Sequence, residues 1–279
     1  MSSQLYYCIN VPVLNMFREP VHRSEIVSQA LFAESVDVIT EDGDSGGWMK
    51  IRTLADNYEG WVDKSGICSI PEEESSNIIK INRLSAHVYD VKDTIYGPMM
   101  TLPFGVRLVA EGGFDEKGNG RWVPVILPDG RRAYVQRGDV STGEQKVHRS
   151  EDVCQLSLSF LGIPYTWGGR SSFGFDCSGF VQMLYREMGI YIPRDSQQQF
   201  LWEGLKEASI HDINEAGLVF FGNGPNAIKH VGLHLGNGTF IHTCAVTENA
   251  PYVRISSLSD LEWNGSGYYP YVALKNLLH

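Results

Sequence analysis

Cys177 lies where a loop rich in glycine and aspartate becomes an amphipathic helix, in the stretch GFDCSGFVQMLYREMG from Gly174 to Gly189. A thiol at a helix N-terminus meets the positive end of the helix dipole and free backbone N–H groups, and both favour the reactive thiolate. Free cysteines are more often buried and inert. Here the polar neighbours Asp176 and Ser178 fit a core cysteine poorly. The pattern therefore favours a nucleophile whose thiol pKa is lowered.

A thiol nucleophile needs a base, and the stretch HVGLHLGNGTFIHTC offers His230, His234 and His242 around a Gly-Asn-Gly turn. A hairpin centred on Asn237 pairs residue 232 with residue 242. His230 and His242 then become diagonal neighbours on one face, about 7–8 Å apart at the backbone. A slip of one residue would send them to opposite faces. The arrangement suits a Cys–His–His triad in which His230 takes the thiol proton and His242 orients its ring.

The same histidines have plainer interpretations. His234 shares the face but lies nearer the turn, and we expect it to be a partly exposed strand histidine. Without Cys177, three ordinary sheet histidines would be the better interpretation. A zinc site is disfavoured, because no carboxylate falls within the two strands and Cys177 and Cys244 lack a familiar ligand spacing. We expect no metal and no cofactor.

The elements that must position these groups follow from periodicity. Apolar residues at helical spacing predict a helix over 150–162 and another from Cys177 to Gly189. The runs GLVFFG, HVGLHLG and TFIHTC read as short strands. Helices followed by strands indicate an α+β domain in the second half of the chain.

The first half of the chain contains two similar stretches, one beginning at Val36 and the other at Val106. Each has an alternating strand, a Gly/Asp turn, a strand led by tryptophan (Trp48 or Trp122), and then an aromatic residue followed by valine. Short alternating runs bounded by turn residues are typical of small antiparallel barrels. The polar segments IPEEESSN and STGEQKVHRS read as the linkers that follow each barrel.

Composition bounds the class of protein. The chain has 279 residues, of which 43% are hydrophobic and 20% charged, and its formal net charge is −10. The length suggests two or three domains, and the absence of a basic stripe disfavours nucleic acid and anionic membranes as partners. The five scattered cysteines, an N-terminus without signal-peptide features and the lack of a long apolar run favour free thiols in a cytoplasmic protein. We expect a monomer.

Four segments in order, GIPYTWGGRSSFGFDCSGFVQMLY, PRDSQQQ, GLVFF and HVGLHLGNGTFIHT, resemble successive motifs of the NlpC-type cysteine peptidases. These are papain-like enzymes that cut peptidoglycan stem peptides. The two β modules resemble the bacterial SH3-like domains that such enzymes often carry. The resemblance implies two small all-β SH3-like barrels, at 1–72 and 76–142, followed by an α+β papain-like cysteine peptidase domain at 147–279.

The resemblance also implies roles for single residues. Cys177 matches the nucleophile, His230 the general base and His242 the orienting residue. Tyr165 matches the tyrosine whose hydroxyl is assigned to the oxyanion site, where the backbone N–H of Cys177 would be its partner.

A subgroup with N-terminal SH3-like domains supplies substrate-binding roles. Asp176, Ser178 and Ser196 match residues of a pocket for the free amine of an L-Ala terminus. Glu25 and Tyr58 resemble the glutamate and tyrosine by which the first SH3-like domain completes that pocket. The plainer alternative is that Glu25 is a solvated charge and Tyr58 a strand aromatic.

Some positions depart from the family pattern. Glu215-Ala216-Gly217 stands where Pro-Gly-Asp is usual, so whatever that aspartate stabilises is absent or replaced. His234 occupies a place that is commonly tyrosine, and Thr243 one that is commonly alanine. None of these positions belongs to the expected triad.

The resemblance implies a γ-D-glutamyl–diamino-acid endopeptidase that acts on free murein peptides with an N-terminal L-Ala, in peptidoglycan recycling or remodelling. The third stem residue, diaminopimelate or lysine, stays open. One alternative is an exported hydrolase that acts on intact peptidoglycan. Another is a non-catalytic peptidoglycan-binding protein, which the presence of Cys177, His230 and His242 together disfavours.

Overall fold

A computed structural model describes residues 6–41, 47–70, 77–143, 147, 149–246 and 250–278. Its contacts divide the chain into two units, one of residues 1–145 with Ser171–Phe173 and the other of residues 146–170 and 174–279. Much of the two expected linkers, namely residues 71–76, 144–146 and 148, lies outside the described residues, as do residues 1–5 at the N-terminus.

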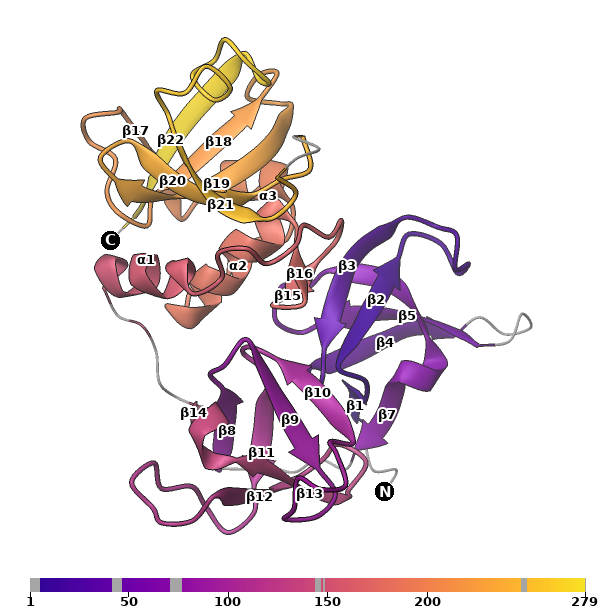
Figure 1. The fold of residues 1–279 in the computed structure, drawn as a ribbon. Coiled ribbons are helices and arrows are strands. Elements are labelled where there is room, and N and C mark those ends of the chain that lie inside the picture. The colour runs from indigo at the N-terminus through magenta and orange to yellow at the C-terminus, as the bar shows by residue number, and fades with distance from the viewer. Residues whose placement is uncertain are drawn as a thin grey trace. The chain divides into compact units, whose positions relative to one another are not determined.

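The first unit begins with a seven-stranded antiparallel sheet in the order β3-β2-β6-β5-β4-β1-β7 (Figure 1). Its elements are β1 (Tyr6–Ile9), β2 (Val13–Phe17), β3 (Ile26–Leu31), β4 (Ser35–Glu41), β5 (Trp48–Thr53), β6 (Glu59–Asp63), the 3-10 turn Lys64–Gly66 and β7 (Ile67–Ile70). Alternate residues of these strands point inward. Ile9, Met16, Ile51 and Val62 form the centre of the core.

The same unit contains a second sheet with the same arrangement, β10-β9-β13-β12-β11-β8-β14. Its elements are β8 (Ile78–Ile81), β9 (Ser85–Tyr89), β10 (Met100–Pro103), β11 (Arg107–Ala110), β12 (Trp122–Ile126), β13 (Arg132–Gln136), the 3-10 turn Arg137–Asp139 and β14 (Val140–Thr142). Trp48 opens β5 and Trp122 opens β12, so the similarity seen in the sequence is a repeat of the fold.

The second unit combines helices with one six-stranded antiparallel sheet in the order β17-β22-β18-β19-β20-β21. Its elements are α1 (Ser150–Leu158), β15 (Arg170–Ser171), β16 (Gly174–Phe175), α2 (Cys177–Glu187), α3 (Ser196–Leu201), β17 (Leu205–Ala208), β18 (Leu218–Gly222), β19 (Ile228–Gly236), β20 (Thr239–Thr243), β21 (Val253–Ser257) and β22 (Tyr271–Leu277). The expected α+β papain-like fold after two SH3-like barrels is confirmed. No helix among the described residues is long and apolar enough to cross a membrane.

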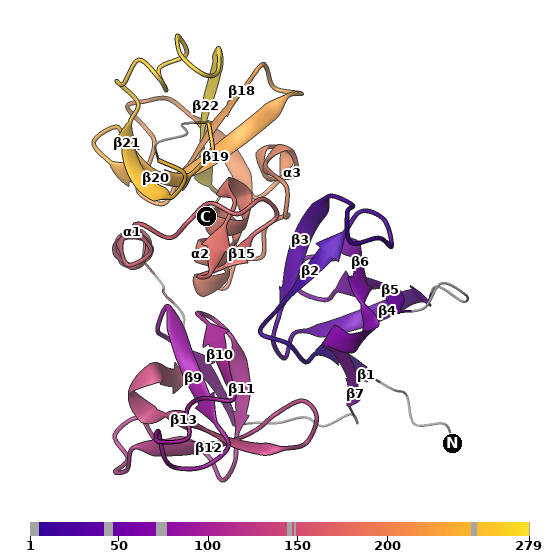
Figure 2. The same ribbon diagram turned by 45° about the vertical axis from the view of Figure 1, so that its right-hand side comes forward.

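Helices α1, α2 and α3 lie against one face of this sheet in both views (Figures 1 and 2). Phe180, Val181 and Leu184 of α2 are fully buried, which fixes the face that the helix turns inward. Each such side chain contributes about 1.5–3 kcal/mol through burial. Gly189 adopts a left-handed φ of 77° just past the helix, as its sequence position predicts.

The β19–β20 hairpin has the expected register. Leu233 pairs with Ile241 and His234 with Phe240, and a bulge follows next to the turn. Asn237 takes a φ of 51° between two glycines of positive φ. Because side chains alternate along a strand, this register places His230 and His242 on one face of the sheet.

Candidate active site

The N-terminus of α2 is built around Asp176 and Cys177. Asp176 is the N-cap, and its Oδ1 accepts the Gly179 N–H at 2.7 Å. Cys177 is the first helical residue, so its N–H has no acceptor within the helix. The Cys177 side chain is partly exposed. Gly179 lets the loop approach closely, because a Cβ there would lie 2.2 Å from the Gly169 carbonyl oxygen.

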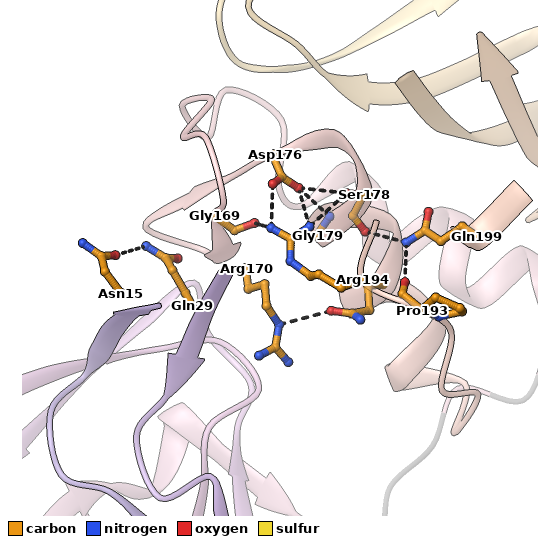
Figure 3. A network of polar contacts seen from close by, with 11 residues as sticks. Asn15, Gln29, Gly169, Arg170, Asp176, Ser178, Gly179, Pro193, Arg194 and Gln199 are labelled. Carbon is orange, nitrogen blue, oxygen red and sulfur yellow. Dashed lines mark hydrogen bonds and ion pairs between the residues drawn. The ribbon is translucent and has the colours of Figure 1, made fainter. Parts of the chain in front are cut away.

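A buried arginine holds the cap in place. Arg194 is 1% exposed, and its Nη1 and Nη2 donate to the Asp176 oxygens at 3.0 and 2.6 Å. Nη1 also donates to Ser178 Oγ at 2.9 Å. Figure 3 shows this guanidinium lying between Asp176 and Ser178, with Gln199 donating to the Ser178 carbonyl oxygen at 3.0 Å. Because removing one partner of a buried ion pair costs about 3–5 kcal/mol, Arg194 and Asp176 depend on each other.

The two histidines are in direct contact. His230 Nε2 lies 2.8 Å from His242 Nδ1, and His242 Nε2 lies 3.0 Å from Ser256 Oγ on β21. Both rings are buried, at 2% and 0% exposure. The hairpin therefore brings together the pair that the sequence predicts, and β21 adds a hydroxyl as a third member.

This chain of contacts sets the tautomers that a base would need. If His230 is to accept a proton from a thiol through Nδ1, its proton must sit on Nε2, which then donates to His242 Nδ1. His242 in turn carries its proton on Nε2 and donates to Ser256 Oγ. Each nitrogen in the series thus has one consistent role.

Aromatic rings enclose the imidazoles. The Trp263 ring centroid lies 5.2 Å from that of His230 and 4.7 Å from that of His242. Tyr269 is nearly parallel to His230, at 9° and 6.4 Å, and Phe221 packs against it at 5.7 Å. Trp263 is 1% exposed. The rings exclude water from the contact between the two histidines.

Burial keeps both imidazoles neutral. It lowers the pKa of His230 to about 3, with a smaller contribution from the Arg254 charge. Burial, then His230 and then Arg254 lower the pKa of His242 well below its ordinary value. At neutral pH each ring is therefore unprotonated.

The pKa of the Cys177 thiol differs from the expected one. Burial, followed by the Asp176 carboxylate, raises the pKa of Cys177 to about 12. The N–H groups of Val231 and Ser178 and the Arg194 charge act in the opposite direction but do not prevail. The expected lowering of this pKa is therefore wrong for the resting structure, because burial and the adjacent carboxylate outweigh the N–H groups and the Arg194 charge that favour the thiolate. The resting pair is a neutral thiol and a neutral imidazole.

Comparison with known proteins agrees with this geometry. The NlpC/P60 family matches residues 162–265, and the bacterial dipeptidyl-peptidase Sh3 domain matches residues 16–67. The chain is 32% identical over 230 residues to the gamma-D-glutamyl-L-lysine dipeptidyl-peptidase of Bacillus subtilis (strain 168), covering 78% of this chain and 72% of that protein. The chain belongs to the NlpC/P60 family.

Two further NlpC/P60 relatives extend the likeness over most of the chain. A gamma-D-glutamyl-L-lysine dipeptidyl-peptidase of Bacillus cereus (strain ATCC 10987 / NRS 248) is 26% identical over 257 residues, which is 86% of this chain and 73% of that protein. The crystal structure of an NlpC/P60 family protein from Bacillus cereus ATCC 10987 superposes with a TM-score of 0.82 at 21% identity. The superposition covers 98% of this chain and 100% of the Bacillus cereus chain, which shows that the two share a fold. The protein is thus an NlpC/P60 peptidase, a hydrolase.

Two tyrosines border the thiol of this NlpC/P60 site. Burial raises the pKa of the half-buried Tyr165, and the next contribution is that of Cys177. Burial and then Cys177 raise the pKa of Tyr269 to about 12. Both hydroxyls therefore stay protonated at neutral pH and can donate hydrogen bonds. Tyr165 is held by its N–H, which donates to the Pro251 carbonyl oxygen at 2.7 Å.

The predicted substrate residues fall in both units. Ser178 is buried and tied to Arg194, and Ser196 is the half-buried first residue of α3. Glu25 is exposed in the first unit, where it pairs with Arg18 at 2.7 Å. Tyr58 packs against the core of the first sheet. Their roles in binding substrate stay predictions.

The departures from the NlpC/P60 pattern have structural counterparts. His234 is buried at 3% exposure, and its Nδ1 donates to the Asn214 carbonyl oxygen at 3.0 Å. The expectation of a partly exposed ring is therefore wrong, because the loop before β18 covers it. Ala216 takes a left-handed φ of 61°. Its carbonyl oxygen accepts a hydrogen bond from the Tyr185 hydroxyl at 2.8 Å. An alanine thus occupies a backbone conformation that favours glycine.

Sequence reasoning missed Arg194, Ser256, Trp263 and Tyr269. Arg194 lies in the motif PRDSQQQ, but nothing in that stretch of sequence distinguishes a buried, paired arginine from a solvated one. Trp263 and Tyr269 lie in an irregular loop between β21 and β22. No periodicity marks that loop, so only the tertiary structure places its aromatic rings on the histidines.

Proposed function

We propose that this protein is a cysteine endopeptidase that cleaves the bond between γ-D-Glu and a diamino acid in free murein peptides that begin with L-Ala. Cys177 is the nucleophile, His230 the base and His242 the orienting residue of a Cys–His–His triad. The diamino acid is diaminopimelate or lysine. The observation that carries the proposal is the buried His230–His242 pair beside the thiol-bearing helix, in a chain whose relatives are named gamma-D-glutamyl-L-lysine dipeptidyl-peptidases.

The proposed chemistry begins from neutral groups. His230 Nδ1 takes the thiol proton as the sulfur attacks the γ-carbonyl carbon, and the imidazolium that forms donates through Nε2 to His242. The Cys177 N–H and the Tyr165 hydroxyl stabilise the oxyanion. His230 then protonates the departing amine. Water, deprotonated by the same ring, hydrolyses the thioester.

Asp176 is the proposed contact for the substrate ammonium, and its environment determines how strong that contact is. Its Oδ1 already accepts from the Gly179 N–H and Arg194 Nη1, and its Oδ2 accepts from Arg194 Nη2. The carboxylate side chain is 12% exposed. A substrate ammonium therefore joins an existing ion pair and does not meet an unpaired charge. The binding free energy gained from the ammonium is therefore expected to be smaller than it would be at an unpaired buried carboxylate.

The test compares kcat/KM on L-Ala-γ-D-Glu-L-Lys, its diaminopimelate counterpart and the N-acetylated form of each. We expect acetylation to lower kcat/KM about tenfold or more, since losing a charge-assisted hydrogen bond costs about 1.5–3 kcal/mol. Equal rates on free and acetylated peptides would remove the amine requirement and favour the hydrolase of intact peptidoglycan. Absence of cleavage of every peptide, with the fold intact, would favour the non-catalytic binding protein.

The remaining parts of the proposal have tests of their own. Glu25→Gln should lower kcat/KM on the free peptide but not on the acetylated one if Glu25 shares in binding the ammonium. A free amine exists only after the peptide has left muramic acid, so we propose that the enzyme acts on released peptides in the cytoplasm. Fractionation of cells that express the full-length protein checks this location.

A further inference from the structure

Two cysteines of the first sheet face each other across paired strands. Cys8 on β1 is directly opposite Cys68 on β7 in the antiparallel register, and their Sγ atoms are 3.4 Å apart. Directly opposed residues of antiparallel strands have Cα atoms about 4.5–5.5 Å apart, within the range of about 4.4–6.8 Å found in disulfides. The two sulfurs can therefore bond without a change in strand pairing.

The two thiols differ in their access to solvent. Cys8 is 1% exposed, whereas Cys68 is partly exposed and lies on β7, which stands at one end of the sheet order. A small disulfide in solution reaches Cys68 but not Cys8. We propose that Cys8 and Cys68 form a thiol–disulfide exchange site, in which Cys68 is the attacking thiol and Cys8 the resolving thiol.

The contacts around the pair support these unequal roles. Burial raises the pKa of Cys8 far above its ordinary value, with further contributions from Cys68 and then Asp129. Burial and Asp129 raise the pKa of Cys68 as well, but its hydrogen bond with Cys8 acts in the opposite direction. Cys68 is therefore the thiol that loses its proton first. Since both values are raised, exchange should accelerate as the pH rises above neutrality.

The reaction partner is a low-molecular-weight disulfide, RSSR. The Cys68 thiolate attacks one sulfur, forms Cys68–S–S–R and releases RS⁻. Cys8 then loses its proton and attacks the Cys68 sulfur, which forms the intrachain bond and releases a second RS⁻. In total two protein thiols and RSSR give one protein disulfide and two RSH, so the small disulfide is reduced as the protein is oxidised.

The second SH3-like sheet shows that the fold does not require this pair. It has the same strand order, and the ladder between β8 and β14 matches the one between β1 and β7. The place of Cys8 and Cys68 is taken there by Lys80 opposite Ser141. The architecture thus forms without thiols at these positions. A disulfide in the first sheet would close a loop between positions 60 apart, and long closed loops give the larger stabilisation.

The test uses full-length protein with Cys177→Ala, which removes the partly exposed active-site thiol from the exchange. This protein and two further variants, adding Cys8→Ser or Cys68→Ser, are incubated with oxidised glutathione at about pH 8.5, where exchange is fast enough to follow. Intact mass and non-reducing peptide maps are recorded over time. We expect the background protein to link Cys8 to Cys68, and Cys8→Ser to accumulate one glutathione on Cys68. Cys68→Ser should acquire a glutathione on Cys8 about tenfold more slowly or not at all.

Two outcomes would overturn the proposal. One is that the folded background protein forms no Cys8–Cys68 bond while the urea-unfolded protein oxidises under the same conditions. The other is that Cys68→Ser gains its adduct as fast as Cys8→Ser, which would reject the assigned roles. A supporting result is a thermal midpoint raised by about 5 °C or more in the oxidised protein and restored by dithiothreitol. None of these three results depends on peptidase activity.

Discussion

Two regions of this molecule hold thiols in unlike surroundings. In both, burial raises the thiol pKa: to about 12 for Cys177 and still further for Cys8. Cys177 lies beside β19, which carries one of two neutral and enclosed histidines. The Cys8–Cys68 pair has Asp129 nearby, an anion that disfavours the thiolate. Thiol acidity in the resting protein therefore does not distinguish the proposed nucleophile from the other thiols. The distinguishing feature that we propose is a neutral imidazole that serves as the proton acceptor.

The largest expected effect is that of Cys177→Ala. Without the sulfur no thioester forms, and kcat should fall by about 10,000-fold or more with the thermal midpoint little changed. The matched control is Cys154→Ser, which alters a buried thiol of α1 that donates to the His234 carbonyl oxygen. Steady-state kinetics on the free tripeptide measures both. Retention of activity in Cys177→Ala would mean that another group is the nucleophile.

The next effect separates the two histidines. His230→Ala should lower kcat about 100- to 10,000-fold, because it removes the proposed base. His242→Gln should retain more activity than His242→Ala, since an amide can still accept from His230 Nε2 and hold the ring. The three variants are compared by kcat/KM. Full activity in His242→Ala would exclude His242 from the site.

A smaller effect is expected at Trp263, which we infer to be a positioning residue. Trp263→Leu should admit water to the histidine pair and raise both imidazole pKa values from their low resting values towards 6.5. A raised pKa leaves more of the base protonated in acid. The acid limb of the kcat/KM profile should therefore move to higher pH, with a loss of up to about fourfold near pH 6.

Arg254, Ser256 and Tyr269 also lie near the two imidazoles, and they are unchanged in the Trp263 variants. Trp263→Phe should restore most of the original profile, because a ring again covers the pair. Trp202→Leu, at the end of α3, is the control for loss of a tryptophan. A profile that falls equally at every pH would assign Trp263 a purely structural role.

The smallest effect concerns alkylation of the two partly exposed thiols. Iodoacetamide should label Cys177 a few-fold faster than Cys68 near neutral pH, because His230 can accept the proton of Cys177 as it reacts. His230→Gln should remove that advantage. Mass spectrometry of digests at short times gives both rates. Faster labelling of Cys68 in the unaltered protein would reverse the comparison.

Much of this architecture follows from local pattern. Alternating strands and Gly-rich turns predict the two barrels, and helical spacing with a glycine at its end predicts α2. The Gly-Asn-Gly turn gives the β19–β20 register, because a tight hairpin turn determines which residues pair. His230 and His242 are thus brought together by a feature that spans only fifteen residues of sequence.

Other features depend on residues far apart in the sequence, and only the tertiary structure decides them. Arg194 pairs with Asp176 across 18 positions, Trp263 covers the histidines from an irregular loop, and Cys68 meets Cys8 across 60 positions. The pKa of Cys177 belongs to the same class. The position of Cys177 at a helix N-terminus is a local feature that the sequence predicts, whereas the burial that raises its pKa comes from packing between helix and sheet. Sequence periodicity records short-range geometry, and desolvation depends on everything that surrounds a group.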